Sequence, residues 1–223
     1  MTASAAAASP APPAVSDVPA RTPFLDARAK ARAVVAVKAF EAQTSAELVI
    51  TVKKQVRSYL EAHLIFGSIA AFGALLFLLF YPLDFNTTLM PLDTFLAFPI
   101  GFALSRILPP LQRLALSAKK RRETVEQAAK AAFVDLGVTK TTGRTGVLVY
   151  VSLFEGVVAI VPDAGITPEA KAAAEGARDA LEAALARIDI KSFAETLEAL
   201  GTAFSTTMAR SADDVNELAD DIA

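Results

Sequence analysis

The sequence predicts an α/β domain that is interrupted by a pair of apolar membrane helices, and three observations lead to this prediction. Short segments rich in β-branched residues alternate with segments of helical period. A stretch of 18 residues without a charge, residues 64–81, separates the first predicted strand from the others. Finally, 53% of the 223 residues are hydrophobic and 21% are charged, a balance that fits one soluble domain with a small membrane part.

Charge and composition exclude several classes of function. The 22 basic and 24 acidic residues leave a net charge of −2, whereas nucleic-acid binders usually carry a basic face. The chain has no cysteine and one histidine, His63. This excludes a disulfide framework, a thiol nucleophile, a zinc–thiolate cluster and a site built from two histidines of one chain. No enzyme signature takes their place, so we assign no catalytic residue and expect no nucleic-acid partner.

The N-terminal part of the chain predicts a disordered segment, a helix and a strand. Residues 1–23 are mostly Ala, Pro and Ser and bury too little apolar surface to offset the entropy of ordering them. Residues 24–42 repeat apolar side chains at helical spacing. Residues 47–52 read ELVITV, which is short and β-branched and therefore predicts a strand.

The charge-free residues 64–81 predict a membrane-spanning helix. At about 1.5 Å per residue they cover most of a hydrocarbon core that is roughly 30 Å thick. The alternative is a buried helix of a soluble domain, which is rarely apolar on all its faces in so small a protein. His63 directly precedes the stretch, where we expect a polar residue at the membrane interface.

A second apolar segment, residues 92–108, is weaker. Asp93 and Arg106 bound its charge-free part and Pro99 interrupts it. A proline is tolerated in a membrane helix when a neighbouring helix supports the freed carbonyl group. We therefore expect this segment to pair with the first one, so that residues 63–109 form a two-helix transmembrane hairpin.

Positive charge on both sides of the hairpin predicts its orientation. The loop between the two segments has no Lys or Arg, whereas basic residues precede and follow the hairpin. By the positive-inside rule both ends and the soluble domain face the cytoplasm, as in a multi-pass protein of the inner membrane. The run that follows the hairpin consists of Lys119, Lys120, Arg121 and Arg122. A run in this place contacts anionic lipid more often than nucleic acid, so we expect it to face the bilayer.

The C-terminal half predicts three helices and a β-hairpin. A helix over residues 125–136 ends at Gly137, and residues 146–153 and 157–161 are strands joined by a tight turn. Thr167 caps the next helix, which runs to about residue 188. The last helix is expected to begin at a capping box, Ser192 to Glu195. Residues 213–223 form an acidic tail.

The strand at residues 47–52 cannot bury its face alone. It is expected to join the strands beyond residue 146, so residues 24–62 and 110–212 form one domain into which the hairpin is inserted. In this organisation the two halves of the domain are separated in sequence by the membrane segments.

The order of these elements resembles the TPM family, named after a thylakoid-lumen phosphatase, a photosystem II repair protein and a modulator of acetylcholine receptors. The resemblance spans about residues 25–220 and is closest to the membrane-anchored bacterial members, which carry a hydrophobic hairpin after the first strand. It rests on the order and spacing of several short motifs. These are Thr44-Ser45-Ala46-Glu47-Leu48-Val49-Ile50, Ala132-Phe133 with Leu136-Gly137, Thr142-Gly143-Arg144-Thr145-Gly146-Val147-Leu148, Ile160-Val161-Pro162-Asp163-Ala164-Gly165-Ile166, and Asn216-Glu217-Leu218.

The resemblance implies a three-layer α/β/α sandwich with a small central sheet. Some members of the family bind calcium or magnesium, a plant member has weak acid phosphatase activity, and others are accessory proteins of membrane complexes. For this chain the resemblance therefore implies two possible properties, the binding of Ca²⁺ or Mg²⁺ and phosphatase activity.

The carboxylates at family-like positions are Glu47, Glu155 and Asp163, and they are the candidate metal ligands because a hard cation takes several oxygen ligands. Glu47 begins one strand and Asp163 ends another, so the two can approach each other. Arg144 stands in the loop where the family often has an acid or Asn, and it can pair with Glu47 or Asp163 without any metal. Asp163 also has an ordinary explanation as a turn residue before Gly165. Ser152 shows no base partner in the sequence.

The sequence thus favours a membrane-anchored, non-enzymatic accessory protein whose domain binds or stabilises an integral membrane protein complex. One alternative is a divalent-metal-dependent phosphatase, and another is a protein that binds anionic lipid surfaces.

Overall fold

The computed structural model describes residues 22–57, 59–82, 86–108, 116–210, 217 and 218. The chain divides into two compact units, Met1–Lys54 with Val125–Ala223, and Gln55–Thr124. The first unit is a mixed α/β domain, as the sequence predicts. Of the segment 1–23 and the tail 213–223, only residues 22, 23, 217 and 218 lie inside the described ranges, so the predictions of disorder and of an acidic tail fall outside them.

A three-stranded sheet, in the order β1-β2-β3, forms the centre of the first unit. Strand β1 (Glu47–Lys53) pairs in parallel with β2 (Gly146–Ser152), and β2 pairs antiparallel with β3 (Val157–Pro162). The β2–β3 connection is a tight turn in which Gly156 has a φ of 65°. Strand β1, which precedes the apolar segments, therefore does pair with the β-hairpin of β2 and β3, which follows them. A single strand could not bury its two faces by itself.

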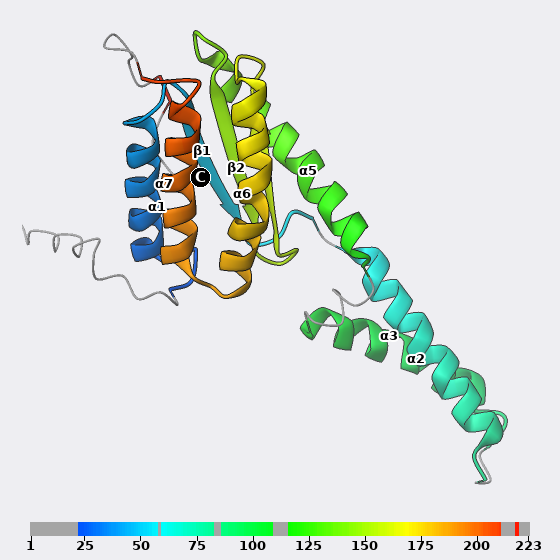
Figure 1. Ribbon diagram of the computed structural model, residues 1–223. Helices are drawn as coiled ribbons and strands as arrows, with labels where there is room; N and C mark the ends of the chain where they lie inside the picture. Colours follow the sequence, from blue (N-terminus) through cyan, green and yellow to red (C-terminus); the bar gives the residue numbers. More distant parts are fainter. Residues whose placement is uncertain (1–21, 58, 83–85, 109–115, 211–216, 219–223) are drawn as a thin grey trace, which may run out of the picture. The chain divides into compact units, whose positions relative to one another are not determined.

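Three helices cover one face of this sheet. Figure 1 shows α1 (Ala27–Glu41), α6 (Pro168–Ala186) and α7 (Ile190–Ser205) side by side along it. Alternate strand residues point toward these helices, and Phe40 of α1 meets Phe204 of α7 with ring centroids 5.2 Å apart. The strand side chains in this core are Leu48, Ile50, Val52, Val147, Val149, Val151, Val158 and Ile160.

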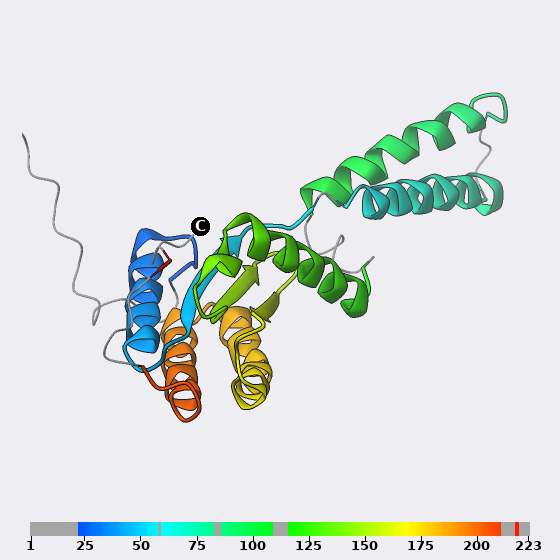
Figure 2. The same ribbon diagram turned by 90° about the horizontal axis from the view of Figure 1, so that it is seen from above.

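The opposite face of the sheet is covered by α5 (Ala118–Asp135), from Val125 onward (Figure 2). Its buried residues in this part are Val125, Ala129 and Phe133. The helix begins seven residues earlier than the apolar period predicts, because its first two turns are polar and give no such signal. Gly137 ends it with a φ of 69°, in the left-handed conformation that glycine adopts without strain.

The start of α7 corrects one prediction. Its N-cap is Asp189, whose carboxylate accepts hydrogen bonds from the backbone N–H and the hydroxyl of Ser192. Ser192 is therefore the third residue of the helix and not its cap. The prediction missed Asp189, whose carboxylate is a favoured N-cap group, and the helix accordingly begins at Ile190, which is buried. The prediction for α6 is confirmed, since the Thr167 hydroxyl accepts from the Ala170 N–H.

The second unit contains α2 (Leu60–Phe80) and α3 (Met90–Ile107). Among the described residues α2 is the one helix long and apolar enough to cross a membrane, and only 11% of its apolar window is buried. Asp93, Pro99 and Arg106 lower the apolar content of α3, so a second span is not shown. Soluble core helices and signal sequences satisfy the same test of length and composition, but a core helix would be mostly buried.

The turn between α6 and α7 contains a strained residue. Ile188 has a φ of 55°, although a β-branched side chain clashes with its own backbone in this left-handed region. Its side chain is about half exposed, so little packing depends on it.

We predict that Ile188→Gly raises the free energy of unfolding by about 0.5–1 kcal/mol, because relief of the left-handed strain exceeds the entropy that glycine adds to the unfolded chain. Urea titration of the full-length protein in mild detergent measures this change. Ile188→Val keeps the branched carbon and serves as the control, for which no gain is expected. A loss of stability in the glycine variant would contradict the assignment of strain.

Candidate functional site

The site that the sequence indicates lies where β1 and β2 begin and β3 ends. Glu47 pairs with Gly146 across the parallel ladder. The Asp163 N–H donates to the Gly146 carbonyl oxygen at 2.8 Å. A side chain at Gly146 would collide with Val138, whose carbonyl oxygen lies 2.5 Å from the position of a Cβ atom. Glu47 and Asp163 therefore flank one glycine at the same end of the sheet, as their places on the strands predict.

Asp163 is held by Arg144. Two hydrogen bonds from the Arg144 Nε, both 3.1 Å, and one from its Nη2, 2.8 Å, reach the carboxylate. Asp163 is buried, whereas the guanidinium is about half exposed. The hydrogen bond from Arg144 lowers the pKa of Asp163, burial opposes this effect, and the Ala164 N–H at 2.6 Å adds to the lowering. The sequence allowed Glu47 or Asp163 as the partner of Arg144, and the structure places it on Asp163.

The turn after β3 is fitted closely to the arginine loop. The Gly165 N–H donates to the Arg144 carbonyl oxygen at 2.8 Å. A Cβ atom at Gly165 would lie 2.2 Å from the Gly143 carbonyl oxygen, so only glycine fits there. Arg144 itself has a φ of 54°. The interpretation of Asp163 as a turn residue and its role as an ionic partner are therefore both realised.

Glu47 is engaged by the C-terminal residues of the chain. Its carboxylate accepts from the backbone N–H groups of Glu217, at 3.1 Å, and Leu218, at 3.3 Å. The Glu217 carboxylate in turn accepts from the N–H and the hydroxyl of Thr142, each at 2.6 Å. The hydroxyl and then the N–H of Thr142 lower the pKa of Glu217.

Glu217 was not among the predicted site residues. Its one signal in the sequence is the Asn216-Glu217-Leu218 motif, which by itself does not say what the carboxylate contacts. The residue lies 75 positions from Thr142, so no local pattern could have paired them.

Glu155 lies at the other end of the sheet. It stands in the turn between β2 and β3, next to Ser152, which pairs with Lys53 at the end of β1. Seven residues of strand at about 3.3 Å each separate that end from Gly146 by roughly 20 Å. Glu155 and the pair formed by Glu47 and Asp163 are thus not brought together. Within the described ranges no three His, Cys, Asp or Glu side chains form a group that could hold a metal ion.

Ser152 has a partner that the sequence did not reveal. Its hydroxyl donates to the Glu155 carboxylate, because the turn brings residue 155 back over the end of β2. Both side chains are fully buried, with exposed fractions of 0% and 1%. A substrate cannot reach this hydroxyl, so the contact does not make Ser152 a nucleophile. Burial, and then the charge of Glu155, raise the pKa of neighbouring Tyr150.

The predicted basic patch is not uniform. Lys119 is exposed and pairs with Glu123 at 3.9 Å, and Lys120 pairs with Glu61. Arg121 and Arg122 are partly buried. The four cations therefore do not form one exposed surface, and Lys120 is paired with Glu61 of α2.

The fold and the sheet-edge contacts define a small α/β domain with an ion pair, in place of a carboxylate cluster, at its candidate site. No family model matches the chain, and no curated protein matches it. Among solved structures it is similar to the NMR structure of the BA42 protein from the psychrophilic bacterium Bizionia argentinensis, with a TM-score of 0.53 and 17% identity, covering 89% of this chain and 94% of that one. At this identity the likeness shows the fold alone, and the TPM resemblance stays a prediction.

We predict that Asp163→Asn lowers the melting temperature by roughly 3–6 °C at pH 7, because it removes the charged partner of Arg144. The pKa of Asp163 is lower in the folded chain, so its stabilising effect is present above the ordinary Asp pKa of about 3.9 and is lost as the pH falls below it. The difference in melting temperature should therefore shrink between pH 5 and pH 2.

Thermal denaturation followed by circular dichroism at several pH values checks this prediction. Asp179→Asn, on the exposed face of α6, is the matched control and should change the melting temperature little at any pH. A difference between Asp163→Asn and the parent that stays constant with pH would show that the ion pair is not its source.

Proposed function

We propose that this protein is a membrane-anchored accessory protein without catalytic activity of its own. In this proposal α2 and α3 form a two-helix transmembrane hairpin in the inner membrane, inserted into a three-layer α/β/α sandwich of the TPM type. The cytoplasmic domain binds or stabilises an integral membrane protein complex. The observation that carries the proposal is the uncovered apolar surface of α2.

The side chains of α2 are too exposed for a helix that is surrounded by water. Phe72 is 62% exposed and Phe80 is 80% exposed. Full burial of such a side chain is worth about 1.5–3 kcal/mol, so leaving a whole helix of them in water is strongly unfavourable. At about 1.5 Å per residue the 21 residues of α2 extend roughly 30 Å, the thickness of a hydrocarbon core. A lipid environment accounts both for the exposed apolar side chains of α2 and for the length of the helix.

The packing between α2 and α3 supports a hairpin. A Cβ atom at Gly101 of α3 would lie 2.4 Å from the Cβ of Ala70, and one at Gly67 would lie 2.9 Å from the ring of Phe98. Small residues allow this close approach, which is how helices associate in lipid. His63 and Ser105 are both buried and share a hydrogen bond of 3.1 Å, so the polar groups of the pair face each other.

The sheet-edge site supports a binding role more than a catalytic one. Asp163 is neutralised by Arg144, and Glu47 is engaged by backbone N–H groups. Neither carboxylate is free to act as a base or to share an ion without displacing these partners. The ion pair and the docked residues 217 and 218 instead stabilise a fixed surface at this end of the domain.

One observation favours the alternative of a divalent-metal-dependent phosphatase, namely that Glu47 and Asp163 flank the same residue, Gly146. A metal-activated water requires a complete ligand set, and the Arg144 guanidinium repels a cation at this place. The two functions therefore make opposite predictions for added metal.

We expect Ca²⁺ or Mg²⁺ at 5 mM to leave the melting temperature unchanged within about 1 °C, because an ion at Glu47 and Asp163 would have to displace the groups that already engage both carboxylates. Thermal denaturation of the full-length protein with and without the ions, after treatment with a chelator, measures this. A rise of several degrees that disappears in Glu47→Gln would instead favour the phosphatase.

We predict that the full-length protein sediments with membranes and resists extraction at alkaline pH, because α2 is embedded in lipid. Phe72→Lys combined with Leu76→Lys places two charges on exposed positions of α2 and should shift more than half of the protein to the supernatant. Val134→Lys, an equally exposed apolar position of α5, is the control and should stay in the membrane. Parent protein that remains soluble without detergent would refute the anchor.

Cysteine labelling tests the orientation of the protein in the membrane. The chain has no cysteine, so a single Thr87→Cys between α2 and α3 can be labelled specifically. In intact spheroplasts an impermeant maleimide should label this variant, whereas Ala172→Cys on α6 should react only after permeabilisation. The reverse pattern would overturn a cytoplasmic domain.

A further inference from the structure

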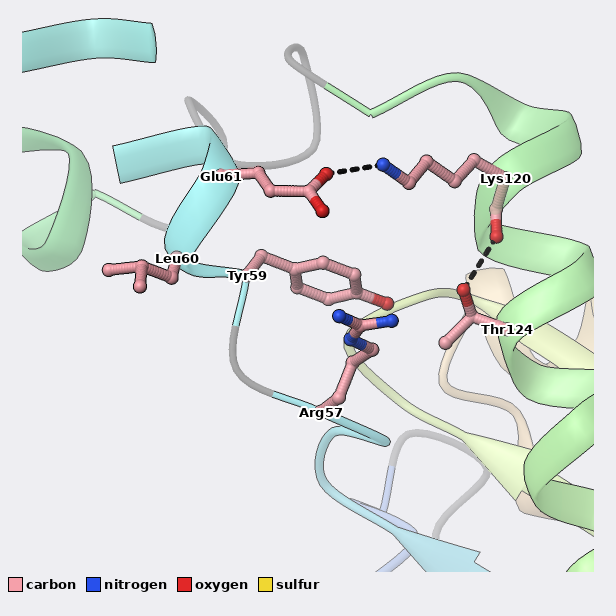
Figure 3. A pocket seen from close by; sticks show the side chains of 6 residues that line it. All are labelled: Arg57, Tyr59, Leu60, Glu61, Lys120 and Thr124. Carbon is pink, nitrogen blue, oxygen red and sulfur yellow. Dashed lines mark hydrogen bonds and ion pairs between the residues drawn. The ribbon is translucent and has the colours of Figure 1, made fainter. Parts of the chain in front are cut away.

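The second unit has a pocket at the beginning of α2 and α5, with a volume of about 200 Å³. Figure 3 shows the six side chains that line it. They are Arg57, Tyr59, Leu60, Glu61, Lys120 and Thr124. All six belong to residues 55–124 and none belongs to the sheet-edge site, so the pocket is separate from the contacts of Glu47 and Asp163.

Two cationic side chains, Arg57 and Lys120, line the pocket, and in Figure 3 the amine of Lys120 points toward Glu61. In Figure 3 the ring of Tyr59 lies in the middle and its hydroxyl lies beside the Arg57 guanidinium, near Thr124. Tyr59 is 5% exposed and therefore a fixed wall. Lys120 reaches across from α5 to pair with Glu61. The Thr124 hydroxyl donates to the Lys120 carbonyl oxygen at 2.8 Å, which ties both residues to the first turns of α5.

Charge sets the class of ligand. Arg57 and Lys120 contribute two positive charges and Glu61 one negative charge, so the lining carries a net charge of +1. This matches one monoanionic phosphodiester. A dianionic phosphomonoester brings a second negative charge close to Glu61 and fits less well. Arg57 offers the planar pair of donors that binds phosphate oxygens bidentately, and Lys120 adds a point charge.

The place of the pocket in the chain selects a lipid over a soluble phosphate. Tyr59 and Leu60 lie one turn before residues 64–81, the charge-free stretch of α2. In the orientation proposed above, this turn is at the depth of the headgroups, where Tyr and Arg side chains commonly lie. Leu60 is exposed beside the charged groups. Its apolar side chain can contact the glycerol and the first acyl carbons of a lipid whose phosphate lies in the pocket.

We propose that this pocket binds the phosphodiester of an anionic phospholipid whose headgroup carries hydroxyl groups, of the phosphatidylglycerol type. The phosphate oxygens accept from Arg57 and Lys120, and a headgroup hydroxyl donates to Glu61. The inference rests on the membrane anchor of the proposed function and adds to it a specific lipid in the cytoplasmic leaflet.

Native mass spectrometry of the full-length protein, released from nanodiscs that contain equal amounts of phosphatidylglycerol, phosphatidic acid and phosphatidylcholine, tests the proposal. Retained phosphatidylglycerol should exceed phosphatidylcholine at least fivefold. Arg57→Gln and Lys120→Gln should each abolish most of this preference. Lys119→Gln removes the same charge from the adjacent, outward-facing residue and should retain it. Glu61→Gln should raise the retention of phosphatidic acid relative to phosphatidylglycerol.

Equal losses in Lys119→Gln and Lys120→Gln would overturn the pocket in favour of general surface attraction. Release of the bound lipid by 10 mM inorganic phosphate would overturn the choice of a lipid ligand. Thermal denaturation of each variant confirms folding. If Arg57→Gln melts well below the parent, Arg57→Lys is tested in its place, because it keeps the positive charge but loses the bidentate donors. Membrane-bound parent protein without lipid preference would refute the pocket and leave the anchor standing, whereas soluble parent protein would refute both.

Discussion

The α/β domain depends on one pairing, the parallel ladder between β1 and β2. Strand β1 cannot bury its faces without β2, and β2 with β3 alone is a hairpin of marginal stability. The residues between the two strands include the whole of α2, α3 and α5, so the ladder closes a very long loop. The closure entropy grows only slowly with length, which is why so large an insertion is compatible with a small domain. The two parts of the α/β domain, before and after residues 55–124, are therefore joined by a ladder that needs a strand from each of them.

Each edge of the sheet has one backbone N–H group that pairs with a side chain of a neighbouring helix. β1 and β3 are its two edges, and an open edge is a template for strand addition. At β1 the Leu48 N–H donates to the Glu41 side chain, and at β3 the Val158 N–H donates to Glu182. Each edge thus has a backbone donor occupied by a glutamate of the flanking helix.

Local signals predicted most of the fold, and the errors follow from contacts that are distant in sequence. The strands, the Gly137 end of α5 and the Thr167 cap depend on neighbouring residues and were predicted from them. The cap of α7 was assigned to Ser192 because a glutamate follows at the usual spacing, but the helix begins at Ile190, which is buried, and Asp189 is its cap. Glu155 was grouped with Asp163 although a hairpin reverses direction, so the residue before β3 and the residue after it lie at opposite ends. Glu217 could not be placed, since its contacts to Thr142 and Glu47 bridge most of the chain.

The two faces of the sheet differ in a way that bears on how rigidly the domain is held. The face toward α1, α6 and α7 is apolar. The face toward α5 buries Tyr150, Ser152 and Glu155, and the hydroxyl of Thr51 there has no hydrogen-bond partner among the described residues. A buried polar group stabilises a fold only when it is paired, so the Thr51 hydroxyl costs stability on this face whereas the contact between Ser152 and Glu155 does not. The helix that covers it is also the helix whose first turns, with Lys120 and Thr124, line the pocket in the second unit.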